Sequence, residues 1–246
     1  VVQPRLLRAC LDDSLHVTLY FSETIPDTAL INVANYYISE TDILLGNPAD
    51  AVSSADGMSV TLTLTTSAAS SVWTVAIVQT FADCSGNVIS NNQANFATPV
   101  ASSPGDILIN EVLFSVDNGA VEFVELFNAS DKIIDMGTME INNYSITSGS
   151  PNTPQVLSEG CYLMFPSSYL VLSDDGDKIK AHYITPNPDA LLDMALPDLL
   201  TDEDIIVIKN TASDVIDSLH TYTSWHFPLL HDTKYNTLEM LSTSHQ

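Results

Sequence analysis

The 246-residue chain has few cysteines, few basic side chains and no long apolar run. Three cysteines are too few for a disulfide framework. Only seven Lys and Arg accompany 31 Asp and Glu, which gives a net charge of −24. Nucleic acid and anionic membranes bind through basic side chains, so both are poor partners. No apolar run reaches the roughly 18 residues of a membrane helix, and the start at Val1, without an initiator Met or a leader, predicts a mature or trimmed fragment.

The chain does contain a series of short alternating segments. In LHVTLYFS, residues 15–22, every second residue is apolar, and the same period recurs in MSVTLTLT at 58–65. Successive side chains point to opposite faces of a strand, so this period predicts strands with one buried face. WTVAIV at 73–78 predicts a third strand, and Ser, Asn, Asp, Gly and Pro separate many such runs. The predicted fold class is all-β.

A domain boundary is predicted in NFATPVASSPGD, residues 95–106, where a strand gives way to small residues and prolines. The predicted domains are 1–100 and 105–246, with a linker at 101–104. Residues 1–104 hold 9 acids and 2 bases, whereas residues 105–246 hold 22 acids and 5 bases. We interpret this acidity as favouring solubility and resisting association.

The first half resembles a known family. FSETIPDTALINVANYYIS, followed by VTLTL, WTVAI and DCSGNVI, is similar to bacterial Ig-like domains over nearly all of residues 1–100. This resemblance implies a β-sandwich that acts as a spacer or presentation module and has no catalytic residues.

The second half resembles a different family. GDILINEVLF at 105–114 and EFVELFNASDKIIDMG at 122–137, followed in order by YLVLS, WHFPLL and TLEMLS, resemble the lamin-tail domains of secreted proteins from Gram-negative bacteria. The resemblance covers residues 105–242 and implies a second Ig-like β-sandwich. Relatives tend to carry an Arg where this chain has TLEMLS, so ligand properties tied to that Arg cannot be transferred.

The cysteines allow one disulfide within the first half. Cys10 ends the first apolar run and Cys84 lies in the turn DCSGN, and the terminal strands of a sandwich are often neighbours. A Cys10–Cys84 bridge would close a loop of about 75 residues and stabilise the domain by roughly 4 kcal/mol. Cys161 is left over, as a small apolar residue near the start of a strand.

Acidic residues supply two kinds of candidate site. Glu111 and Glu125 lie inside apolar strand runs and could form the acid and base of a glycosidase, but we interpret them as structural hydrogen-bond acceptors. The segment SDDGD could bind calcium through oxygen ligands, with a solvated turn as the default interpretation, and residues 202–204 leave the same two alternatives. The predicted calcium ligands are Asp174, Asp175 and Asp177.

The final candidate is an aromatic and histidine-rich segment near the end of the chain. His220, His226 and His231 are spaced by six and five residues in a Pro-containing segment, which does not suit a zinc site. An exposed aromatic patch there would be the best place for a protein or glycan partner. The predicted ligand-binding residues are Trp225, His226 and Phe227.

These observations predict two tandem Ig-like β-sandwiches in an exported bacterial protein, located in the periplasm, at the cell surface or outside the cell. No nucleophile elbow, phosphate loop or dinucleotide fingerprint occurs, so we expect no enzyme and no cofactor beyond the calcium alternative. The predicted role is a spacer, scaffold, adhesion or presentation module at the cell envelope. The alternative is a specific ligand-binding module that uses loops at one end of the second domain.

Overall fold

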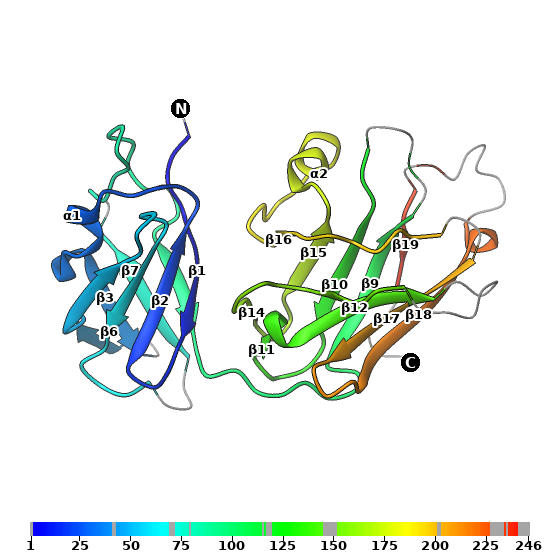
Figure 1. The fold of residues 1–246 in the computed structure, drawn as a ribbon, viewed down its shortest axis with the longest axis horizontal. Coiled ribbons are helices and arrows are strands. Elements are labelled where there is room, and N and C mark those ends of the chain that lie inside the picture. The colour runs from blue at the N-terminus through cyan, green and yellow to red at the C-terminus, as the bar shows by residue number, and fades with distance from the viewer. Residues whose placement is uncertain are drawn as a thin grey trace. The chain divides into compact units, whose positions relative to one another are not determined.

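The structure, a computed structural model, divides the chain into two compact units, Val1–Pro99 and Val100–Gln246, each described here by itself (Figure 1). It describes residues 2–40, 43–68, 72–78, 80–114, 116, 120–144, 152–200, 203–226, 234 and 236–240. Both units consist mainly of strands, so the predicted all-β fold class is confirmed.

The first unit is a sandwich of two four-stranded sheets, ordered β1-β2-β6-β5 and β4-β3-β7-β8. Its strands are β1 Leu6–Leu11, β2 His16–Phe21, β3 Tyr36–Glu40, β4 Ile43–Gly46, β5 Asp50–Ser53, β6 Ser59–Thr63, β7 Trp73–Ile77 and β8 Gln93–Phe96. Two short helical segments, α1 Asp27–Leu30 and η1 Val33–Asn35, connect β2 to β3. The three strands predicted from alternation are therefore confirmed as β2, β6 and β7.

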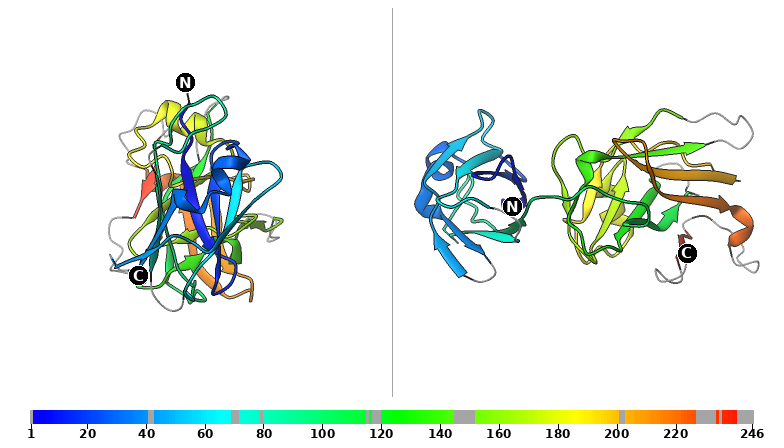
Figure 2. Two further views of the ribbon diagram at one scale, coloured as in Figure 1. Left: turned by 90° about the vertical axis from the view of Figure 1, so that its left-hand side faces the viewer. Right: turned by 90° about the horizontal axis from the view of Figure 1, so that it is seen from below.

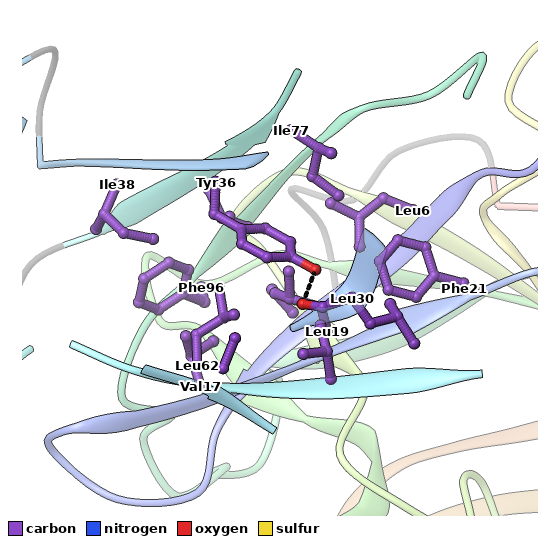
Figure 3. Close-up of a cluster of buried hydrophobic side chains, with 14 of the residues drawn as sticks. Leu6, Val17, Leu19, Phe21, Leu30, Tyr36, Ile38, Leu62, Ile77 and Phe96 are labelled. Carbon is purple, nitrogen blue, oxygen red and sulfur yellow. Dashed lines mark hydrogen bonds between the residues drawn. The ribbon is translucent and has the colours of Figure 1, made fainter. Parts of the chain in front are cut away.

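The core of the first unit forms where the apolar faces of the two sheets meet, as Figure 3 shows. Val17 and Leu19 of β2 and Leu62 of β6 are fully buried, as their alternation predicts. Tyr36 of β3 is also fully buried, and its Oη donates a hydrogen bond of 2.7 Å to the Leu30 carbonyl oxygen. Burial raises the pKa of Tyr36, so the side chain stays a neutral donor that ties α1 to the core.

The turn at residues 83–87 shows that the predicted Cys10–Cys84 disulfide is wrong. The Asp83 side chain is buried and accepts hydrogen bonds from the backbone N–H groups of Ser85 and Asn87 and from the Asn87 amide. This turn keeps Cys84 on the surface, where it is exposed and carries a free thiol, whereas Cys10 is buried in β1. The position of Cys84 in the sequence, shortly before the last strand of this unit, does not show toward which side the turn directs its side chain.

The second unit is also built from sheets that pack face to face, seen from two further directions in Figure 2. One sheet is ordered β16-β15-β10-β9-β19, the other β13-β12-β17-β18, and β11 pairs with β14. The strands are β9 Ile107–Leu113, β10 Phe123–Asn128, β11 Ile134–Asp135, β12 Met139–Tyr144, β13 Gln155–Val156, β14 Leu163–Met164, β15 Tyr169–Ser173, β16 Leu191–Asp193, β17 Glu203–Asn210, β18 Val215–Tyr222 and β19 Leu238–Glu239. Two single-turn segments, η2 Met136–Thr138 and η3 Thr223–Trp225, complete the unit with helix α2.

Helix α2, Gly176–His182, follows β15 and was not predicted. The Asp175 side chain caps it by accepting from the Lys178 backbone N–H at 3.1 Å, and Lys180 and His182 lie in its last turn. An acceptor at the N-terminus and basic side chains at the C-terminus both stabilise a helix. The segment SDDGD, which the sequence suggests as a calcium site, thus contains the N-cap and the first residues of α2.

Residues 189–200 form a long connection with one short strand. Residues 191–193 form β16, parallel to β15, and residues 194–200 have no regular structure. Figure 1 shows the chain passing from β16 toward β17, which belongs to the other sheet. The side chains that hold this connection are described below.

Candidate binding surface

The structure places two of the three predicted ligand-binding residues, Trp225 and His226, in different environments. Trp225 ends η3, directly after β18, and is 53% exposed. The next residue, His226, is buried, donates from Nε2 to the Asn236 carbonyl oxygen at 3.0 Å and packs edge-on against Phe114. Phe227 lies outside the described residues. His226 therefore supports the fold, and of the two described residues Trp225 is the one that faces solvent.

Trp225 is the end of a series of three rings, which we call the aromatic row: His220, Tyr222 and Trp225. The His220 and Tyr222 ring centroids are 4.2 Å apart and those of Tyr222 and Trp225 are 5.3 Å apart, with interplanar angles of 33° and 51°. Residues 220 and 222 share a face of β18 because alternate side chains do so. That face points away from the core, because the neighbouring residue Leu219 packs against the core on the opposite face of β18.

A chain of hydrogen bonds fixes two rings of the aromatic row, His220 and Tyr222. Glu203 of β17 lies opposite Tyr222 across the sheet, and its Oε1 is 2.9 Å from Nε2 of His220. The Tyr222 hydroxyl is 2.9 Å from Nδ1 of His220. With Nε2 donating to the carboxylate, Nδ1 accepts from the hydroxyl, so one imidazole orients both neighbours. The sequence suggests His220 only as a candidate metal ligand. Its hydrogen bond to Glu203 depends on the register of β17 against β18, which no local pattern gives.

A second polar contact lies on the same face of this sheet. Tyr144 of β12 pairs in register with Ile205 of β17, and the Lys209 ammonium donates to the Tyr144 hydroxyl at 3.0 Å. This hydrogen bond is the main reason that the pKa of Lys209 is raised. The surface from Tyr144 to Trp225 thus carries aromatic rings together with a carboxylate and an ammonium group.

The three predicted calcium ligands point to different partners. Asp174 Oδ1 accepts from the Leu196 backbone N–H at 2.8 Å, Asp175 caps α2, and Asp177 pairs with Lys180 at 2.7 Å. Within the described ranges, no three His, Cys, Asp or Glu side chains are arranged to hold a metal ion. Calcium stays an untested prediction.

The other acidic run and the histidines do not form one site either. Glu203 lies on the outer face of β17, whereas Asp204 is buried on the inner face, so these neighbours cannot ligate a common ion. Asp202 and His231 lie outside the described residues. His220 binds Glu203, and His226 binds a backbone carbonyl.

Glu111 and Glu125 do lie opposite each other, on β9 and β10. The Asn110 amide donates to Glu125 Oε1 at 2.7 Å, and Glu239 of β19 lies opposite Glu111 on its other side. Burial raises the pKa of Glu125, with smaller contributions from the charges of Glu111 and Glu239. The hydrogen bond to Asn110 agrees with the structural interpretation of Glu125.

Three carboxylates, exposed Asp174, half-buried Glu122 and buried Asp204, hold the connection at residues 194–200. Asp174 accepts from the backbone of Leu196, Glu122 Oε2 accepts from Leu199 at 3.2 Å, and Asp204 Oδ2 accepts from Leu200 at 3.0 Å. Burial, together with the charges of Asp198, Asp174 and Asp204, raises the pKa of Glu122 to about 7. Glu122 directly precedes β10, Asp174 directly follows β15 and Asp204 lies in β17, so no local sequence pattern marks these acids as a group.

Comparison with known proteins identifies the second unit. The lamin tail domain family matches residues 100–224, half of the chain. No curated protein matches the sequence. Among the described residues, no helix is both long and apolar enough to cross a membrane.

Solved structures align with the chain at low identity. The N-terminal part of the bacterial S-layer protein SbsC is 17% identical, over 68% of this chain and 45% of that one, with a TM-score of 0.36. A longer SbsC structure is 12% identical over 89% and 40%, also with a TM-score of 0.36. Native alpha-2-macroglobulin from Escherichia coli, spanning domains MG0-NIE-MG1, is 10% identical over 96% and 90%, with a TM-score of 0.30. The chain spans less than half the length of the S-layer structures, and such alignments carry no functional conclusion.

The family match covers β9 to β18, the elements that form the second sandwich and most of the aromatic row. By this match, the chain belongs to the lamin tail domain family.

Proposed function

We propose that the chain is a non-catalytic module of an exported bacterial protein and serves at the cell surface as a spacer, scaffold or adhesion and presentation domain. The observation that carries the proposal is the use of the strand carboxylates: Glu125 bonds an asparagine amide, and Glu122 and Asp204 bond the backbone of a connection. In a hydrolase such carboxylates would face a substrate, whereas here they accept hydrogen bonds from other groups of the protein.

Two further points support a surface role. The lamin-tail sequences that the second half resembles occur in secreted proteins, and the sequence of the first unit resembles bacterial Ig-like domains. The charge of −24 disfavours binding to phosphate-rich polymers and favours a solvated, non-aggregating module. We propose that the first unit is such an Ig-like spacer.

Specific ligand binding is the second candidate function, and one observation favours it. Trp225 exposes about half of its surface beside two other rings that are fixed by hydrogen bonds. Large exposed aromatic side chains grouped in this way are typical of recognition surfaces.

The envelope role predicts saturable binding of the purified chain to isolated cell envelopes of the native host. Co-sedimentation is measured against increasing envelope concentration, once with calcium and once with EDTA. We expect the same saturation curve in both arms if calcium plays no part, and loss of binding in EDTA if the predicted calcium ligands act. Sedimentation no greater than that of an unrelated acidic β-sandwich protein would contradict adhesion and leave only the spacer role.

A further inference from the structure

We infer that the aromatic row is a glycan-binding site whose ligands carry neutral or amino-bearing pyranose rings. The inference deepens the second candidate function by naming a site and a ligand class. It replaces the predicted group Trp225, His226 and Phe227 with Trp225, Tyr222, His220 and Glu203.

The first argument is the geometry of the rings. Pyranose rings have an apolar face of C–H groups that packs on the face of an aromatic ring, and stacked ring contacts contribute beyond the area that they bury. Trp225 is 53% exposed and His220 has a side chain that is 36% exposed, with Tyr222 between them. At centroid spacings of 4.2 and 5.3 Å the three rings pack against one another rather than lying side by side in one plane, so the half-exposed Trp225 at the end of the row is the ring on which a pyranose can stack.

The second argument is the polar group at the edge of the row. The Glu203 side chain is 40% exposed, and its bond to His220 uses one of several lone-pair positions on the carboxylate. The remaining positions can accept hydrogen bonds from sugar hydroxyls or an ammonium group, and bonds to a charged acceptor are stronger than neutral ones. A stacking surface with one adjacent carboxylate is a combination that suits a sugar better than a purely apolar ligand.

Preorganisation is the third argument. The Tyr222 hydroxyl, the His220 imidazole and the Glu203 carboxylate form one hydrogen-bonded chain across two paired strands. Side chains already held in place lose little conformational freedom when a ligand binds, so a shallow surface can still bind measurably.

Charge narrows the ligand class. Residues 105–246 hold 22 acids and 5 bases, and Glu203 lies in the row itself. Uronic-acid or sialylated glycans would meet like charge, which lowers affinity and association rate. Neutral sugars avoid this repulsion, and protonated amino sugars are attracted by the negative charge.

Calorimetric titration of the full chain tests the site with three probes: an N-acetylglucosamine tetramer, a glucosamine tetramer and polygalacturonate. We expect saturable binding of the first or second probe and none of the third. The Trp225→Ala variant is expected to bind roughly tenfold more weakly, the loss of about 1.4 kcal/mol that one ring stack is worth. Trp225→Phe should retain part of the affinity, because a ring remains.

Tyr169→Ala is the matched control, since Tyr169 is another aromatic residue of the second unit, 47% exposed, on β15 of the other sheet. This variant should bind like the unaltered chain. Absence of saturable binding to all three probes, equal loss in Tyr169→Ala and Trp225→Ala, or preference for polygalacturonate would each overturn the inference. None of these results would bear on whether the chain is exported, which is measured separately.

Discussion

Replacing Asn128 by alanine is expected to destabilise the second unit by about 4 kcal/mol, because the change leaves several buried polar groups without partners. Asn128 is fully buried at the end of β10. Its Nδ2 donates to the carbonyl oxygens of Lys132 and Met164, both at 2.9 Å, and its Oδ1 accepts from the backbone and hydroxyl of Ser130. One side chain thus joins β10, the loop that follows it and β14.

The measurement is calorimetric melting of the full chain, in which the substitution should lower one thermal transition by roughly 8 to 16 °C. In a domain of this size, 1 kcal/mol corresponds to roughly 2 to 4 °C. Asn187→Ala, an exposed asparagine in the same unit, is the control and should change stability by less than about 0.5 kcal/mol. Asn128→Asp keeps the volume but turns a carboxylate oxygen toward two carbonyls, so it should be at least as damaging. A mild effect of both Asn128 variants would contradict the assigned role.

Replacing Glu122 by glutamine is expected to stabilise the second unit above pH 7 and to flatten its pH dependence. The pKa of Glu122 is raised to about 7 by burial and by the neighbouring acids Asp198, Asp174 and Asp204. A raised carboxyl pKa means that folding favours the protonated form, so this contribution is fully present below pH 4.5 and is lost as the pH rises through about 7. The loss amounts to on the order of 3 kcal/mol at pH 8.

Glutamine cannot ionise, yet its carbonyl oxygen can still accept from the Leu199 backbone N–H. The variant should therefore melt about 6 °C or more above the unaltered chain at pH 8 and match it near pH 4.5. The pKa of Asp204 is also raised by burial, so some pH dependence of the same sign should remain in the variant. Glu159→Gln, at an exposed glutamate, serves as control and should keep the original slope. Equal slopes in Glu122→Gln and the unaltered chain would show that Glu122 is not the titrating group.

The strands of both units could be predicted because their signal is local. Alternation in residues 15–22 and 58–65 fixed which side chains of β2 and β6 are buried, and family resemblance supplied the order of elements in the second unit. Helix α2 had a local signal too, since Asp175 precedes a segment with basic residues in its last turn. The same aspartates also suggest a calcium site, and that interpretation competes with the helix signal.

The candidate site could be predicted only in part. Trp225 stood out as a large aromatic residue in a polar segment, but its partners depend on the register of β17 against β18, which brings Glu203 next to Tyr222 across 19 positions of sequence. Register is set by packing of the whole inner face, so no pattern within either strand reveals it. The orientation of Cys84 likewise depends on the hydrogen bonds of Asp83, which a spacing argument does not contain.

The exposed thiol of Cys84 allows the most direct test of the claim that this chain is a cell-surface module. Intact cells of the native host are treated with a membrane-impermeant maleimide, and labelling of the chain is compared before and after lysis, with Cys84→Ser as control. The account predicts that Cys84 is labelled on intact cells and that the signal disappears in Cys84→Ser. Labelling that appears only after the cells are lysed would contradict it.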